Sequence, residues 1–355
     1  GKLPCTGLGS KLEPTIKRAA PIAKPKYTIS PPRLLGAKRS VIENEQLRHN
    51  IALLKSLTED KHSHFLLKEM QDDFKLGRMT KPTVIDPRNP GIDLSTILLA
   101  RRFSREQGVR SDGTVKLRAV DDETGSGLNA ATEPTEKLHN EHIDMLLQTT
   151  SLTAKQSTEA PAYLKADVDS AFRRIPVALG HRKYTWVAIL HKGQYWIARH
   201  NSTCFGATAS VHAWDRVGAL LAHIARVWLN LPVLRYVDDY FACDRPENAS
   251  HALECFAKLC RTLLGEDSLL NKKMEAGNPI TILGLRVTAD HEKVQVWPEP
   301  TKVAKWAGQI TNVIDKMRLA PTEASKIAGR LSWAAQHTFM RIGCAALRPI
   351  FTQVN

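Results

Sequence analysis

The chain has 355 residues, 43% of them hydrophobic, which is enough material for more than one core-bearing unit. No stretch reaches the roughly 18–20 uninterrupted apolar residues of a membrane span, and the six cysteines have neither zinc-type spacing nor a disulfide framework. These features argue against a membrane-spanning or disulfide-stapled protein and favour an intracellular setting, while the formal net charge of +14 indicates a polyanionic partner, most simply a nucleic acid.

The first third of the chain predicts a tail, two helices and a strand-and-loop region. Residues 1–38 are rich in Pro, Lys and Arg without hydrophobic periodicity, so we expect a basic, disordered tail that is either a linker or a nucleic-acid-binding arm. Residues 41–78 carry apolar side chains at helical spacing, which predicts two helices. The stretch RSDGTVKLRAVDD at 110–122 reads as strand and loop.

Two segments of the middle third bring small and acidic residues to the ends of predicted elements. The first, YLKADVDSAFRRIPV at 163–177, alternates along its first residues, which predicts a half-buried strand with Asp167 near its end. The second, CFGATASVHAWDRVGALLAHIARVW at 204–228, places small residues before an amphipathic helix. Such an entry lets a flat ligand approach the backbone closely.

The segment LRYVDDYFACD at 234–244 sets two adjacent aspartates between strand-like runs. Asp238 and Asp239 can be interpreted as a plain turn between strands at 233–237 and 240–243. Asp-Asp is, however, a poor choice where a tight hairpin needs positive φ, and two adjacent like charges repel each other unless a cation lies nearby. Paired carboxylates at a strand end therefore suggest a Mg²⁺ site, which a carboxylate from elsewhere in the chain would complete.

The last third predicts helices. Residues 301–317 carry an apolar stripe that we interpret as core, formed by Val303, Trp306, Ile310, Val313, Ile314 and Met317. A second helix is expected after Pro321. The chain begins with Gly rather than Met, and we expect it to be a piece of a longer reading frame.

Six blocks in order, KLRAVDD, ADVDSAF, FGATAS, YVDD, LNKKME and ILGLRV, resemble the successive motifs of reverse transcriptases, particularly Gypsy-like and DIRS-like retrotransposons. The resemblance covers roughly residues 70–350. It implies an α+β right-hand polymerase fold with fingers, an antiparallel-sheet palm and a helical thumb. The implied divisions are the tail at 1–38, N-terminal helices and fingers at 39–160, a palm at 161–297 with a catalytic and a primer-grip hairpin and part of the fingers inserted, and the thumb at 298–355.

The resemblance also implies the catalytic residues. Asp167 matches the first catalytic aspartate, Asp238 the second and Asp239 the third carboxylate, and together they would bind two Mg²⁺ ions, with Mn²⁺ as a substitute. Lys273 matches the basic residue that closes over the leaving pyrophosphate and would act as general acid, with its neighbour Lys272 left open for the same role.

The nucleotide and primer contacts follow from the same resemblance. Phe172 matches the aromatic residue beneath the sugar, where a ring would clash with a 2′-hydroxyl and favour deoxynucleotides. Arg118 would contact the triphosphate, with Lys116 or Arg110 as its companion. The remaining contacts are Phe205 and Gly206 in the nucleotide site, after a Cys204 that departs from the family's proline, and Leu283 and Gly284 in the primer-grip hairpin.

The function that the resemblance implies is RNA-directed DNA synthesis on an RNA or DNA template with a primer, using deoxynucleoside triphosphates. One alternative is a catalytically inactive reverse-transcriptase-like protein that binds nucleic acid, although such a relic usually loses a carboxylate. An RNA-dependent RNA polymerase shares the palm, but Phe172 and the Tyr-Val before the paired aspartates argue against it. A plain DNA-binding module explains the charge and leaves the ordered blocks unexplained. The sequence leaves the oligomeric state and any accompanying nuclease, integrase or recombinase open.

Overall fold

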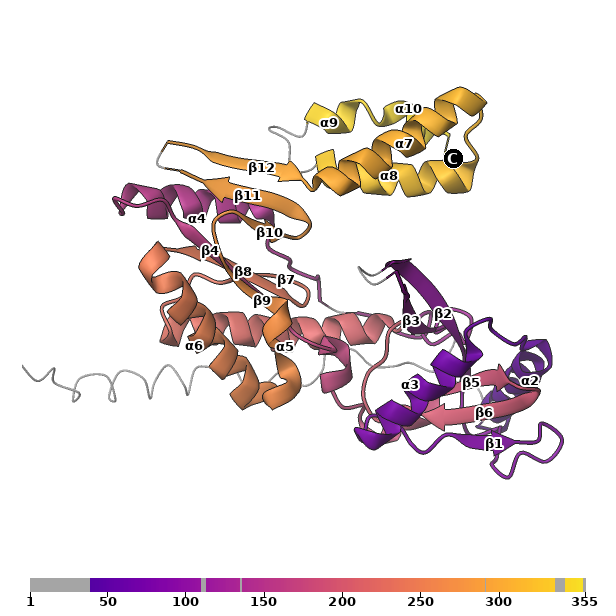
Figure 1. Ribbon diagram of the computed structural model, residues 1–355. Coiled ribbons are helices and arrows are strands. Elements are labelled where there is room, and N and C mark those ends of the chain that lie inside the picture. Colours follow the sequence, from indigo (N-terminus) through magenta and orange to yellow (C-terminus); the bar gives the residue numbers. More distant parts are fainter. Residues whose placement is uncertain (1–38, 110–112, 135, 291, 336–341, 354–355) are drawn as a thin grey trace, which may run out of the picture. The chain divides into compact units, whose positions relative to one another are not determined.

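The computed structural model describes residues 39–109, 113–134, 136–290, 292–335 and 342–353 (Figure 1). The predicted tail over 1–38 and Arg110 lie outside these residues. The chain divides into two compact units, unit 1 from Gly1–Leu138 and Phe172–Ala213, and unit 2 from His139–Ala171 and Trp214–Asn355. Helix α5, Thr208–Trp228, carries the chain from the first unit to the second. Among the described residues, no helix combines the length and apolar character needed to cross a bilayer.

Unit 1 is built on a five-stranded sheet of order β1-β6-β5-β2-β3, in which β2 and β5 pair in parallel and the other neighbours are antiparallel. Leu66 and Met70 of helix α3 are fully buried and pack with Val187 and Ile189 of β5, which fixes the helix on the sheet. The elements are α2 Arg39–Ser56, α3 Ser63–Lys75, β1 Thr83–Ile85, β2 Leu99–Val109, β3 Val115–Asp121, the 3₁₀ helices η1 Ala171–Arg174 and η2 Leu179–Tyr184, β5 Trp186–His191 and β6 Gln194–Arg199.

Unit 2 is centred on a four-stranded antiparallel sheet of order β7-β8-β4-β9. The predicted half-burial of 163–168 is present from Leu164 to Val168, where buried and part-exposed residues alternate, but fails at Tyr163, which is 0% exposed on the face opposite Leu164. Tyr163 packs with residues of α4 and of a second sheet, while Tyr240 on the other face stacks on Phe256 of α6. The elements are α4 Ile143–Lys155, β4 Ala162–Asp167, β7 Leu234–Tyr236, β8 Asp239–Asp244, α6 Pro246–Leu264, η3 Glu266–Ser268, η4 Asn271–Lys273 and β9 Met274–Gly277.

A second, three-stranded sheet of order β10-β11-β12 follows, and then, within the residues that the structure describes, four helices. The expected hairpin is present, because Ile282 pairs with Leu285 across a two-residue turn in which Leu283 and Gly284 both have positive φ. The elements are β10 Ile280–Ile282, β11 Leu285–Ala289, β12 Val294–Pro298, α7 Pro300–Lys316, α8 Pro321–Ala335, α9 Ile342–Ala345 and α10 Arg348–Thr352.

Both predicted C-terminal helices form, but the interpretation of the α7 stripe as core was wrong. Val303 is 45% exposed, Ile314 61% and Met317 88%, and α7 has no buried residue. The buried side chains here belong to α8 instead, with Ala324, Ile327 and Ala328 inside. Amphipathic spacing identifies the apolar face of a helix, but it does not say how completely other parts of the protein pack over that face.

Candidate active site

Three aspartates gather at one end of the central sheet of unit 2. Asp167, the last residue of β4, lies directly opposite Asp239, the first residue of β8, in the antiparallel register. Asp238 immediately precedes β8, and its carbonyl accepts a hydrogen bond of 3.1 Å from the Val168 N–H. The strand ends therefore bring together the carboxylates that the sequence placed 71 positions apart.

The turn that carries Asp238 is one residue earlier than the sequence suggested. Because Tyr236 pairs with Asp239, the two turn residues are Val237 and Asp238, and Val237 adopts φ 55°, a strained value for a β-branched residue. Trp214 Nε1 and Arg235 Nη1 donate to the Val237 carbonyl at 2.8 and 3.1 Å. These bonds hold the strained turn and thereby fix the place of Asp238.

Electrostatics set this group of carboxylates apart from ordinary strand ends. Burial, followed by the charges of Asp238 and Asp167, raises the pKa of Asp239 from 3.8 to about 7, although Lys165 and Lys273 oppose the shift. Carboxylate oxygens are the ligands that Mg²⁺ prefers, and a divalent cation relieves repulsion among clustered acids. The donor set thus fits a divalent metal ion.

Lys273, the predicted general acid, lies at the same place. Its Nζ is 3.1 Å from Asp167 Oδ2 and 3.1 Å from Asp169 Oδ1. Burial opposes the charged form, but the two carboxylates outweigh it and raise the pKa of Lys273 above its usual value. Asp169 was missed by the sequence reasoning, although it stands two positions after Asp167 within the quoted ADVDSAF block.

A cavity of about 530 Å³ opens beside these groups and brings the predicted primer-grip residues to them. Leu283 and Gly284 line it together with Asp167, Asp239 and Lys273. Lys272, the open alternative to Lys273, and Lys302 from α7 also face this cavity. Three of the four catalytic candidates and both primer-grip candidates therefore line one space in unit 2, and Asp238 is not among its lining residues.

The predicted nucleotide-site residues gather in unit 1. The rings of Phe172 and Phe205 have centroids 5.2 Å apart and are tilted by 57°. The Arg118 guanidinium lies 4.6 Å from the centre of the Phe205 ring, in cation–π geometry. Lys116, two residues before Arg118 on β3, is exposed.

Position 206 has no room for a side chain and therefore requires glycine. Its φ is +117°, and a Cβ there would lie 2.0 Å from the Asp121 carbonyl oxygen. Asn129 holds the same turn, because its side chain donates to the Gly206 carbonyl at 2.8 Å and accepts from the Thr208 N–H at 2.8 Å. The small-residue entry to α5 thus allows a close backbone approach, but to another segment of the protein.

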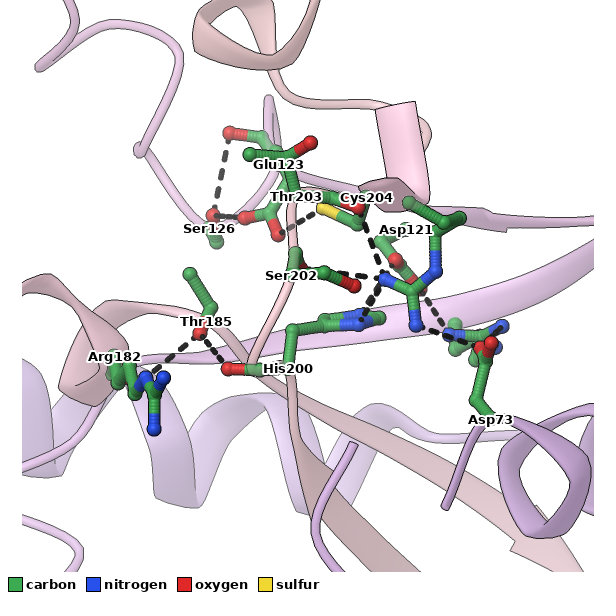
Figure 2. A network of polar contacts seen from close by, with 12 residues as sticks. Asp73, Asp121, Glu123, Ser126, Arg182, Thr185, His200, Ser202, Thr203 and Cys204 are labelled. Atoms are coloured by element: carbon green, nitrogen blue, oxygen red, sulfur yellow. Dashed lines mark hydrogen bonds and ion pairs between the residues drawn. The ribbon is translucent and has the colours of Figure 1, made fainter. Parts of the chain in front are cut away.

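Asp121, His200 and Cys204 form a further buried group in unit 1 whose ligand atoms lie within 4.8 Å of one another, a spacing that could hold a metal ion (Figure 2). Both ring nitrogens of His200 are engaged, one with Arg173 at 2.7 Å and the other with Asp121 at 2.9 Å. Burial and then the nearby Glu123 raise the pKa of the Cys204 thiol, which keeps it protonated. These groups are better described as a hydrogen-bonded network than as a metal centre.

Comparisons with known proteins agree at the level of the fold. A scan against protein families finds no matching family model, and a search of curated proteins finds no significant match. Among solved structures, the chain is similar to a foamy viral protease-reverse transcriptase in complex with double-stranded DNA, with a TM-score of 0.55 and 17% sequence identity. The match covers 83% of this chain and 43% of the viral chain. The chain therefore has a reverse-transcriptase-like fold of mixed helices and sheets, and spans less than half the length of that protein.

Proposed function

We propose that this chain is an RNA-directed DNA polymerase of a Gypsy-like or DIRS-like retrotransposon, which adds deoxynucleotides to the 3′-hydroxyl of a primer on an RNA or DNA template. The observation that carries the proposal is Asp167 facing Asp239 at adjacent strand ends, with Asp238 on the strained turn between β7 and β8. That arrangement occurs on a chain whose fold is similar to that of a viral reverse transcriptase.

The proposal assigns a role to each group of side chains. Asp167, Asp238 and Asp239 would hold two Mg²⁺ ions, which supply charge stabilisation for the attacking and leaving oxygens. Lys273 would hold a proton near the leaving phosphate, and its contacts with Asp167 and Asp169, which keep it charged, support this role. Leu283 and Gly284, in the turn that lines the same cavity, would support the primer end.

Nucleotide selection belongs to the residues of unit 1. Phe172 would lie beneath the sugar and exclude a 2′-hydroxyl, with Phe205 and Gly206 beside it. Arg118 and Lys116, two positions apart on β3, would contact the triphosphate. In this proposal residues 39–160 form the N-terminal helices and fingers, 161–297 the palm with part of the fingers inserted, and 298–355 the thumb. The net charge of +14 supports binding of the template and primer.

The test is primer extension by the purified chain on RNA and DNA templates with Mg²⁺ or Mn²⁺. Asp167→Ala and Asp238→Asn should each abolish extension while retaining template-primer binding. Asp244→Asn, at the far end of β8, is the matched control and should extend normally. Binding without extension by the unmodified chain under every condition would refute the polymerase and leave a nucleic-acid-binding relic.

A further inference from the structure

Five charged and polar side chains of unit 1, four of them buried, contact one another in a closed ring, and Figure 2 shows Asp73, Asp121 and His200 among them. Its contacts are Asp73 with Arg173 at 2.7 Å, Arg173 with His200 at 2.7 Å, His200 with Asp121 at 2.9 Å, Asp121 with Arg102 at 3.3 Å, and Arg102 back to Asp73 at 3.8 Å. Four of the residues belong to α3, β2, β3 and η1, and His200 directly follows β6. The ring therefore joins five segments that are far apart in the sequence.

The ring is electrically balanced. Two carboxylates face two guanidinium groups, and burial lowers the pKa of His200 to about 4, so the imidazole between them is neutral. Arg102, Asp121, Arg173 and His200 are all at most 7% exposed. Buried ion pairs of this kind are often no more stabilising than apolar side chains of the same volume, so stability alone does not account for the ring.

One side of the ring holds Phe172. Arg173 is the next residue, and its Nη1 donates to the carbonyls of Thr203 and Ser202 at 3.0 and 3.3 Å. The Thr203 hydroxyl in turn donates to the Phe172 carbonyl. The Thr203 N–H is also bound, to the Ile175 carbonyl at 2.8 Å.

The opposite side holds Phe205. The Asp121 N–H donates to the Phe205 carbonyl at 3.0 Å, and the Asp121 carbonyl faces Gly206 so closely that no side chain fits. The ring is thus linked by hydrogen bonds to the main chain at both phenylalanines, whose tilted rings have centroids 5.2 Å apart.

We infer that the Asp73–Arg173–His200–Asp121–Arg102 ring is a positioning device that sets the separation of Phe172 and Phe205 and thereby the discrimination between deoxy- and ribonucleotides. This inference rests on the proposed function for its selectivity readout. The ring residues touch no reacting atom and act through the two aromatic residues.

The selectivity test measures kcat/KM for a deoxy- and a ribonucleotide in primer extension. Arg173→Lys and Arg102→Lys keep the charge but remove the planar fork that spans two partners. Each should lower the deoxy/ribo ratio about tenfold. Arg101→Lys, next to Arg102 on β2, is the control and should leave the ratio unchanged. A purely structural defect reduces the active fraction equally for both nucleotides, so it cancels from the ratio.

A double variant tests whether the ring affects nucleotide selection through Phe172. If the ring acts through Phe172, adding Arg173→Lys to Phe172→Ala should lower the ratio no further. An unchanged ratio in both ring variants, or full additivity with Phe172→Ala, would overturn the inference while leaving the polymerase intact.

A second readout needs no polymerase activity. Hydrogen exchange of the Asp121, Ile175 and Thr203 amides reports directly on the bonds beside the two phenylalanines. Arg173→Lys should speed their exchange at least tenfold, and Arg101→Lys should not. If the unmodified chain extends no primer, the proposed function fails, but equal exchange in the two variants is what would overturn the ring as a positioning device.

Discussion

Replacing Asp239 by asparagine should stabilise the metal-free protein even though the residue is proposed as a metal ligand. In the folded chain burial and the charges of Asp238 and Asp167 raise the pKa of Asp239 from 3.8 to about 7. A shift of this size corresponds to at most about 4 kcal/mol. Because the carboxylate is partly exposed, solvent screening reduces the expected gain of Asp239→Asn to about 1–2 kcal/mol.

The pH dependence of this gain has a definite sign. A carboxyl group whose pKa is raised on folding gives stability that is fully present below pH 3.8 and is lost as the pH rises to about 7. Asp239→Asn removes that loss, so its advantage should be near zero at pH 4 and reach its full size at pH 8. Urea unfolding with EDTA at the two pH values measures it.

Two controls distinguish the effect of the raised Asp239 pKa from a general effect of removing a negative charge. Asp244→Asn, at the other end of β8, should change the free energy of unfolding by less than about 0.5 kcal/mol at either pH. Adding Mg²⁺ or Mn²⁺ should reverse the order, because binding stabilises the unmodified site through mass action. A variant no more stable than the unmodified chain at pH 8 in EDTA would refute this account of the carboxylate group.

Three further outcomes are expected. Glu123→Gln should stabilise the chain by about 2 kcal/mol at pH 8 and by nothing at pH 4, because burial and then Asp121 raise the pKa of Glu123 from 4.5 to about 8, and paired urea titrations measure this. Gly206→Ala should cost more than about 3 kcal/mol in urea unfolding, whereas Gly180→Ala, where a Cβ meets nothing within 4 Å, should cost less than about 1. Asp169→Asn should lower kcat for primer extension about tenfold with little change in KM for the nucleotide, because Lys273 loses one of its two carboxylate partners, and steady-state kinetics would reveal a KM effect instead if Asp169 served binding.

Local patterns were sufficient for the elements that carry the candidate site. The strand ending at Asp167 forms at Ala162–Asp167, and the hairpin around Asp238 forms with its turn displaced by one residue. Both elements have strong local signals, namely alternation and β-branched or aromatic residues. The displacement arises because Trp214 and Arg235 hold Val237 at positive φ, a tertiary influence that no local rule contains.

Contacts between distant segments were beyond the sequence argument. Nothing local marks Asp73, Arg102 or His200 as members of one ring, because they are brought together only by sheet order and helix packing. The apolar stripe of α7 also depended on distant contacts. Its periodicity predicted the helix correctly, but the prediction that the stripe is buried was wrong.

The tripeptide Val-Asp-Asp occurs twice in this chain, at 120–122 and at 237–239, and its two copies show what separates a structural acid from a candidate ligand. Burial disfavours the charge of Asp121, but Arg102 and His200 outweigh it and lower the pKa to about 2. Asp239 faces two further carboxylates, and its pKa moves in the opposite direction. In the first copy an ion pair with Arg102 and a hydrogen bond from His200 balance the charge of Asp121, which serves geometry. The second copy concentrates negative charge that an external cation can balance. The direction of the pKa shift, rather than the motif, therefore favours 237–239 over 120–122 as the place where this fold would bind metal.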